Sequence, residues 1–277
     1  MKTICLLDRN IVSDIRKYLE TGACANIALA KSQDRPYNVI STLSSTLEGS
    51  RGNIQTLSQF DETTEAETKL ISLFYKHAGV DSRYLKANTL DAYTSLYEDI
   101  RKRLELFSPL ISLAQTEFEL QNTPNKEKAR KLEDKLVEFA NANKIPLTGI
   151  PGIGLISAIY GNPHSRKILK PQTSALSDKD KSDAAYNTLY DLEIAKRIIM
   201  LKATTLRGTR TNIKFVTRDE GLKKFIDCIS ESRSHASENM IGDVKVNFEL
   251  TISDQLFPTL RTDADKLGLI ERMKGWS

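Results

Sequence analysis

The stretch Ile4-Cys5-Leu6-Leu7-Asp8-Arg9-Asn10 decides the fold, because a wholly apolar run ends abruptly in an acid. Such a run is typical of a strand buried on both faces of a sheet. The apolar residues that follow recur at the spacing of an amphipathic helix, and they are Ile11, Val12, Ile15 and Leu19. The sequence therefore places Asp8 at the carboxyl end of a buried strand. In an open α/β sheet ligands bind at that edge, so Asp8 is either a helix cap or a site residue.

Strands and helices alternate along the rest of the chain. The segments 38–40 and 213–217 are predicted as further strands. Helices are expected over about 42–48, 61–78, 182–203 and 221–229. Residues 243–251 alternate between apolar and polar, which predicts a half-exposed strand at a sheet edge. This order predicts an α/β fold with a largely parallel sheet flanked by helices, in one domain over 1–277.

A long helical insertion is expected at about 85–180. Its two main helices are predicted over about 89–121 and 125–143, and Pro124 in the break lets them fold back as a hairpin. The apolar stripes of such a hairpin must be buried, by each other or by a second copy or partner. We therefore expect the hairpin to form a wall or lid beside the binding cleft that also serves as an association surface.

A glycine-rich stretch, Gly149-Ile150-Pro151-Gly152-Ile153-Gly154, follows the hairpin. It resembles the turn of a helix-hairpin-helix unit, in which backbone amides meet a DNA phosphate. One copy of so short a pattern is weak, so a loop leading into a helix over 155–160 is the favoured interpretation.

Net charge, cysteine count and apolar run length limit the classes to which the protein can belong. A net charge of +4 among 277 residues is too mild to imply nucleic-acid binding by itself. The odd number of cysteines, Cys5, Cys24 and Cys228, favours a reducing compartment over a disulfide framework. Neither an apolar run of the roughly 18 residues that a membrane span needs nor a signal peptide is visible, so a cytoplasmic protein is expected.

Four acids share one positional logic. Asp8 and Asp219 each follow an apolar strand and precede a helix, Glu48 lies on a helix after the second strand, and Asp191 lies on a helix that leads to the last parallel strand. Because the carboxyl ends of parallel strands converge, these acids are candidates for one cleft. Clustered carboxylates repel one another, and oxygen-loving cations such as Mg²⁺ or Mn²⁺ relieve that conflict.

In the order and setting of these four acids the sequence resembles the PIN-domain nucleases. Their Asp-Thr-Asn after the first strand corresponds to Asp8-Arg9-Asn10. Their Glu in a Thr-Leu-x-Glu-like setting corresponds to 46–48. Their Asp-x-x-Ile-Ala and Val-Thr-x-Asp runs correspond to 191–195 and 216–219. The resemblance covers about 3–60 and 183–230. It implies a PIN-like sheet whose catalytic and metal-binding residues are Asp8, Glu48, Asp191 and Asp219.

Several assignments stay open. Arg9 replaces the family's Thr, so it either contacts phosphate or marks a divergent site. Glu193 is an alternative to Asp191 as third ligand. Asn10 either caps a helix or orients Asp8, and Thr217 either supports the site or simply ends a strand. Asp8 and Asp219 are alternatively plain helix caps.

The function implied is metal-dependent hydrolysis of phosphodiester bonds, with RNA favoured over DNA. By family analogy the role is that of a toxin or defence effector. The alternatives are a non-catalytic PIN-like interaction module and a DNA nuclease. Basic residues of the hairpin are either a solvated face or a surface that follows the phosphate backbone. They are Arg101, Arg103, Lys126, Lys128 and Arg130.

Overall fold

The computed structural model describes residues 2–49, 55–172, 177–205, 211–238 and 244–276. The chain forms two compact units. Unit 1 comprises residues 1–103 and 204–219, and unit 2 comprises residues 104–203 and 220–277. The single domain expected from the sequence, with an insertion at about 85–180, stays a prediction; residues 104–203 of unit 2 overlap most of that insertion.

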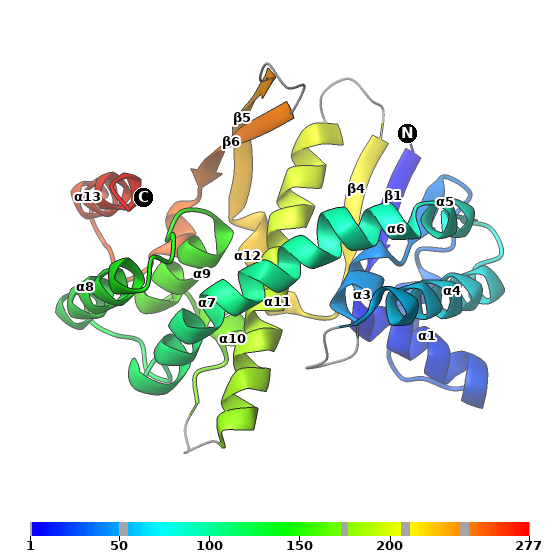
Figure 1. Cartoon of the computed structure of the whole chain (residues 1–277), viewed down its shortest axis with the longest axis horizontal. Coiled ribbons are helices and arrows are strands. Elements are labelled where there is room, and N and C mark those ends of the chain that lie inside the picture. The colour runs from blue at the N-terminus through cyan, green and yellow to red at the C-terminus, as the bar shows by residue number, and fades with distance from the viewer. Residues whose placement is uncertain (1, 50–54, 173–176, 206–210, 239–243, 277) are drawn as a thin grey trace. The chain divides into compact units, whose positions relative to one another are not determined.

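Unit 1 is built on a four-stranded, wholly parallel sheet with the order β3-β2-β1-β4. Figure 1 shows β1 beside β4. The strands are β1 (Lys2–Leu7), β2 (Asn38–Ser41), β3 (Gly79–Val80) and β4 (Thr211–Val216). The helices are α1 (Arg9–Thr21), α2 (Ile27–Lys31), α3 (Leu43–Glu48), α4 (Leu57–Phe74), α5 (Ser82–Ala87) and α6 (Thr89–Ala92). The predicted α/β class and parallel sheet are therefore confirmed.

The core of unit 1 forms where α1, α2 and α4 pack on the sheet. Cys5 and Leu7 of β1 are fully buried and join one apolar cluster with the stripe of α1. Helix α1 begins at the Asp8 cap and ends at Gly22, whose φ of 74° is the left-handed conformation that glycine adopts without strain. Helix α4 begins with a reciprocal capping box between Thr56 and Gln59.

Both helices that the sequence predicts for the hairpin are present. A π-helical segment (Tyr93–Tyr97) follows α6 and continues into α7 (Glu98–Glu117), and α8 (Lys126–Ala142) comes after the break. Helix α7 runs across the boundary between the units at Arg103. Unit 2 also contains α9 (Ile150–Ile159), α10 (Pro163–Leu169), most of α11 (Asp178–Thr205), α12 (Glu220–Asp227), a 3₁₀ turn (Asp254–Leu256) and α13 (Asp263–Lys274).

The last predicted strand is present and lies in a second sheet. Strand β6 (Val244–Ile252) pairs antiparallel with β5 (Ile229–Glu238) in a two-stranded sheet of unit 2. The predicted strand at a sheet edge is thus present, and its partner β5, directly before it in the chain, was not predicted.

The glycine-rich stretch is part of a buried helix and not a loop. Every residue of α9 is buried, Gly152 and Gly154 included. A Cβ on Gly154 would lie 2.6 Å from Leu192 of α11, and one on Gly152 would lie 1.7 Å from the Leu147 carbonyl oxygen. These glycines permit close packing inside unit 2, so their backbone amides are not offered to a DNA phosphate.

Candidate functional site

Asp8 lies where the sequence analysis placed it, directly after β1 and before α1. Its backbone N–H donates to the Val216 carbonyl of β4 at 3.0 Å, so the carboxyl ends of β1 and β4 are side by side. Its side chain accepts a hydrogen bond from the Arg9 backbone N–H at 2.8 Å, which makes it the cap of α1. The same carboxylate also accepts hydrogen bonds from the Asn10 amide and from the Thr217 hydroxyl. Asp8 is thus both a cap and part of a polar cluster at the sheet edge.

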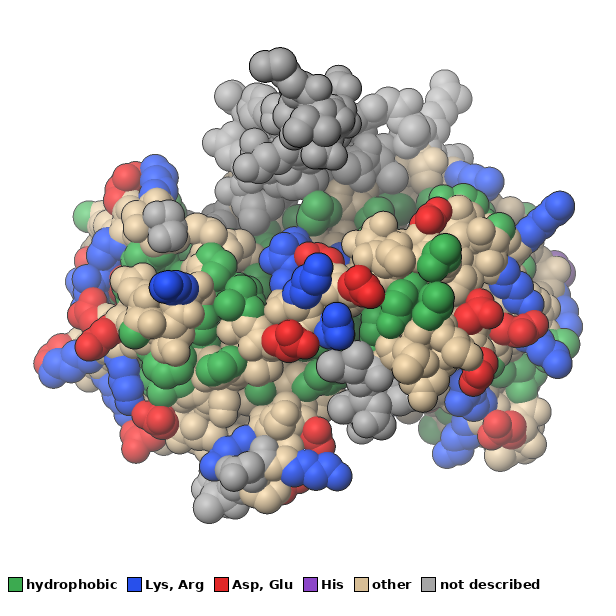
Figure 2. Space-filling view, in the orientation of Figure 1, with side chains coloured by type: hydrophobic (Ala, Val, Ile, Leu, Met, Phe, Trp, Pro, Cys, Tyr) green, Lys and Arg blue, Asp and Glu red, His purple; other side chains and the backbone are tan. Residues whose placement is uncertain are grey.

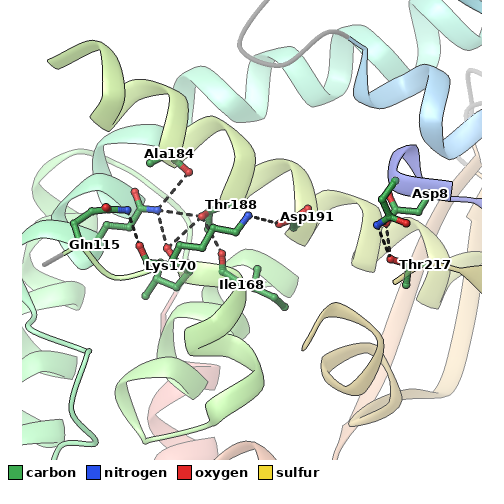
Figure 3. Close-up of polar contacts among 11 residues, drawn as sticks. Asp8, Gln115, Ile168, Lys170, Ala184, Thr188, Asp191 and Thr217 are labelled. Atoms are coloured by element: carbon green, nitrogen blue, oxygen red, sulfur yellow. Dashed lines mark hydrogen bonds and ion pairs between the residues drawn. The ribbon is translucent and has the colours of Figure 1, made fainter. Parts of the chain in front are cut away.

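Thr217 is the centre of that cluster. Its hydroxyl donates to Asp8 and accepts hydrogen bonds from the Asp219 backbone N–H at 2.9 Å and the Asn10 side chain at 3.1 Å. Figure 3 shows the Asp8–Thr217 contact. Because a hydroxyl has only one proton to donate, these contacts fix its orientation. Asn10 also accepts a hydrogen bond from the Arg218 backbone N–H at 3.2 Å, so it orients Asp8 and ties the β4 loop to α1.

The carboxylates of Asp8 and Asp219 interact. Burial raises the pKa of the Asp8 carboxyl, and the nearby negative charge of Asp219 raises it further, while the hydrogen bonds from Thr217, Arg9 and Asn10 act in the opposite direction. This pattern is typical of two acids that share a partly desolvated site. The structure therefore brings together the two acids that follow β1 and β4.

Glu48 is the last residue of α3, on the helix after β2, as expected, and it is half-buried. In the part of the chain that the structure describes, no group of three or more His, Cys, Asp or Glu side chains is close enough to hold a metal. The placement of Glu48 beside Asp8 and Asp219 therefore stays a prediction.

Asp191 lies on α11 in unit 2, where the Lys170 ammonium is 3.2 Å from its carboxylate (Figure 3). Lys170 ends α10 in the left-handed conformation, with φ 51°. Gln115 of α7 donates to the Leu169 carbonyl at 2.7 Å and to the Thr188 hydroxyl at 3.1 Å. This network fixes the end of α10 against α11, one turn from Asp191.

Of the two candidates on α11, Asp191 is the more accessible. Its side chain is 24% exposed, whereas that of Glu193 is completely buried, with the Lys196 ammonium 3.7 Å away. Accessibility favours Asp191 for a role at a site. Because Asp191 belongs to unit 2 and the other three acids belong to unit 1, a shared four-carboxylate site stays a prediction.

Arg9 makes a contact that the sequence did not predict. Its Nη1 lies 3.1 Å from Oε1 of Glu67 on α4, a residue 1% exposed, and also donates to the Ser45 carbonyl at 3.4 Å. Burial raises the pKa of the Glu67 carboxyl, and the Arg9 charge acts against that increase. The sequence did not indicate Glu67 as a buried acid, because α4 has an ordinary amphipathic pattern and Arg9 is distant in sequence.

A further overlooked acid, Asp81, follows β3 at the same edge of the sheet. Its backbone N–H donates to the Ile40 carbonyl of β2 at 3.1 Å. Burial raises the pKa of its carboxyl to about 6, against the effect of a hydrogen bond with the Ser41 side chain. Every strand of the parallel sheet except β2 is thus followed within three residues by an acid, at Asp8, Asp81 and Asp219.

Four of the five basic side chains singled out on the hairpin form ion pairs, and the role of Arg101 stays a prediction. Lys126 lies 2.7 Å from Asp265, Lys128 lies 2.9 Å from Glu119, and Arg103 lies 3.1 Å from Asp99. Arg130 pairs with Glu133 at 2.7 Å and with Asp134 at 3.1 Å. Figure 2 likewise shows positive and negative side chains interspersed on the face that it presents. These pairs favour the solvated-face interpretation over a surface that follows phosphates.

The chain matches no protein-family model, no curated protein and no solved structure. The resemblance to PIN-domain nucleases therefore rests on the four short motifs in their order. Among the helices described, none combines the length and apolar character needed to cross a membrane.

Proposed function

We propose that the protein is a metal-dependent nuclease that hydrolyses phosphodiester bonds. The observation that carries the proposal is the convergence of Asp8 and Asp219 at the adjoining carboxyl ends of β1 and β4, with Thr217 bonded to both residues. This is the edge of an α/β sheet at which ligands bind.

The residues present fit a divalent ion of the Mg²⁺ class. Mg²⁺ prefers oxygen donors and is usually bound through one or two carboxylates, with water and substrate phosphate completing its coordination. Asp8 and Asp219 supply two such carboxylates, and their mutual repulsion is relieved by a cation. Glu48 and Asp191 are the proposed additional ligands. When bound, the ion lowers the pKa of water and polarises the scissile phosphate.

The side chains around the two acids prepare them for this role. Thr217 and Asn10 donate to Asp8, which holds its carboxylate in one orientation. Neighbours that orient metal ligands in this way commonly account for 10- to 100-fold in metal affinity, as an order of magnitude. RNA is proposed as the preferred substrate on the PIN resemblance alone, which is an argument by analogy.

A second candidate is a non-catalytic interaction module. The ion pair of Lys170 with Asp191 supports it, because the Lys170 ammonium already balances the charge of that carboxylate. Under this alternative Asp191 is structural, and the chain neither binds Mn²⁺ tightly nor cleaves nucleic acid.

Incubation of the full chain with labelled single-stranded RNA and DNA tests the proposal. The reactions contain Mg²⁺, Mn²⁺ or EDTA, with Asp8→Asn as the inactive control. We expect cleavage of RNA that requires the metal and disappears in Asp8→Asn. If the protein cleaves only DNA in the presence of metal, then DNA and not RNA is the substrate. If stable wild-type protein cleaves neither, the result supports the interaction module.

A further inference from the structure

Glu67 is a buried carboxylate with a complete set of partners. Its side chain is 1% exposed, and Oε1 accepts from the Ser45 hydroxyl at 3.1 Å and from Arg9 Nη1 at 3.1 Å. Its Oε2 accepts from the Thr46 hydroxyl at 3.2 Å. A buried charge is strongly unfavourable unless it is paired and hydrogen-bonded, so this carboxylate depends on all three neighbours.

These partners belong to the two segments that carry the first two predicted site acids. Arg9 directly follows Asp8 at the start of α1. Ser45 and Thr46 lie on α3, which ends at Glu48. One carboxylate on α4 therefore connects the start of α1 with the short helix that carries Glu48.

Helix α3 is short and is held both by the burial of Leu47 and by polar contacts. It contains six residues, fewer than an isolated helix needs for stability in water, and the side chain of its N-cap Thr42 makes no capping hydrogen bond. Two of its hydroxyls and one of its carbonyls contact the Arg9–Glu67 pair. The pair is thus a main polar support of this helix.

We infer that Arg9 and Glu67 are positioning residues that set Glu48 relative to Asp8. The inference rests on the proposed function, in which these two acids hold the metal. It also gives Arg9 a role. The guanidinium of Arg9 contacts Glu67 and the Ser45 carbonyl, so the residue supports the site indirectly, through α3 and α4. Under this inference Arg9 acts on the site through Glu67, and the alternatives of a phosphate contact or a divergent site stay predictions.

Glu67→Gln and Arg9→Lys test the inference in the full chain. The first keeps the shape of the side chain and removes its charge, and the second keeps a positive charge but loses the forked guanidinium. The matched control is Glu133→Gln, because Glu133 in unit 2 is also 1% exposed and pairs with Arg130 and Arg272, each at 2.7 Å. All three variants therefore disturb a buried ion pair, but only two disturb the one beside Asp8.

Two measurements are made on each variant. Hydrogen exchange by mass spectrometry follows the amides of α3 and of the first turn of α1. Electron paramagnetic resonance gives the Mn²⁺ dissociation constant. We expect exchange in α3 to accelerate by roughly 10-fold or more in Glu67→Gln, with the centre of α4 unchanged. Mn²⁺ affinity should fall by about 10- to 100-fold, whereas Glu133→Gln should match the wild type in both.

Each outcome has one consequence. Uniform acceleration across unit 1, or an Mn²⁺ affinity that falls equally in Glu133→Gln, would overturn the positioning role. Selective loosening of α3 in a protein whose wild type binds no Mn²⁺ would instead overturn the proposed function and leave the support of α3 standing. Arg9→Lys, the milder change, provides the comparison if Glu67→Gln does not fold, and we expect its effects in the same direction.

Discussion

Thr217 donates a hydrogen bond to Asp8 across the two parallel strands β1 and β4, and it accepts one from the backbone N–H of Asp219. A single hydroxyl thereby contacts the Asp8 carboxylate and the backbone of Asp219. Thr217→Val removes the hydroxyl and keeps a similar shape. We expect Mn²⁺ affinity to fall by about 10-fold or more, because Asp8 loses a donor that orients it.

Thr217→Ser is the matched control, since it retains the hydroxyl. Its Mn²⁺ dissociation constant, measured by calorimetry, should remain within a few-fold of the wild-type value. Equal affinities in the Val variant and the wild type would show that Thr217 merely ends a strand.

Asp81 should make stability depend on pH. Burial raises the pKa of its carboxyl from the ordinary 3.8 to about 6 in the folded state. A raised pKa means that the folded protein holds the proton more tightly, so this stabilisation is present below pH 4 and is lost as the pH rises through about 6. We expect Asp81→Asn to increase the free energy of unfolding at pH 7.5 by about 1–3 kcal/mol.

Urea denaturation at pH 4, 6 and 7.5 checks this expectation. The gain in Asp81→Asn should be largest at pH 7.5 and smallest at pH 4. A variant that is less stable than the wild type at pH 7.5 would contradict a buried carboxylate that is costly when ionised.

Asp34 should show the opposite dependence. Its carboxylate accepts hydrogen bonds from the backbone N–H groups of Lys76, His77 and Ala78 in the loop between α4 and β3, at 3.1, 2.7 and 2.8 Å. Burial acts to raise the pKa of Asp34, but these donors outweigh it and hold the pKa below its ordinary value. The stabilisation is therefore present above pH 3.8 and is lost as the pH falls through the folded-state pKa.

Asp34→Ala should lower the free energy of unfolding by about 1–3 kcal/mol at pH 7, since charge-assisted hydrogen bonds disappear. The loss should vanish at low pH. Asp61→Asn, an exposed acid on α4, is the control and should change stability by less than about 0.5 kcal/mol. Unchanged stability of Asp34→Ala at pH 7 would refute the role of this carboxylate in the loop.

Alanine at the two buried glycines of α9 should destabilise unit 2, although alanine favours helices by about 1 kcal/mol over glycine. The Gly152 position is the more severe, because its Cβ would meet rigid backbone, whereas at Gly154 it would meet the flexible end of Leu192. We expect Gly154→Ala to cost about 1–3 kcal/mol and Gly152→Ala to cost more.

Gly268→Ala on α13 is the control, because its Cβ would lie at an ordinary 3.6 Å from Arg272. Thermal unfolding should show a higher melting temperature for Gly268→Ala and lower ones for the other two. Stabilisation by Gly154→Ala would contradict the close packing of α9 on α11.

The sequence predicted those elements that carry a strong apolar pattern. Strand β1 and helix α1 follow from continuous and periodic apolar runs, and the positions of Asp8 and Asp219 follow from the ends of β1 and β4. Strand β3 escaped prediction because its two residues carry no period. Strand β5 escaped because its sequence ISESRSHASE is almost entirely polar, so the two-stranded sheet that it forms with β6 was not predicted.

The supports of the site were not predictable from local patterns. The partners of the buried Glu67 carboxylate are Arg9, 58 residues away, and two hydroxyls of α3, and no local spacing reveals such contacts. The glycines of α9 suggested a loop, because glycine is usually read as a turn residue. Glycine is required there because Leu147 and Leu192 lie too close for a Cβ atom, and that closeness depends on tertiary packing.

The rate of RNA cleavage by Asp219→Asn, compared with Asp227→Asn, tests the central claim most directly. Asp219 directly precedes α12 and lies beside Asp8, whereas Asp227 is the last residue of α12, is exposed and lies 3.8 Å from Lys202. We predict that single-turnover cleavage in Mn²⁺ falls by about 100-fold or more in Asp219→Asn, since a metal ligand supplies several kcal/mol to the transition state. Asp227→Asn should cleave at the wild-type rate. Equal cleavage rates for folded Asp219→Asn and the wild type would contradict the assignment of this carboxylate pair as the active site.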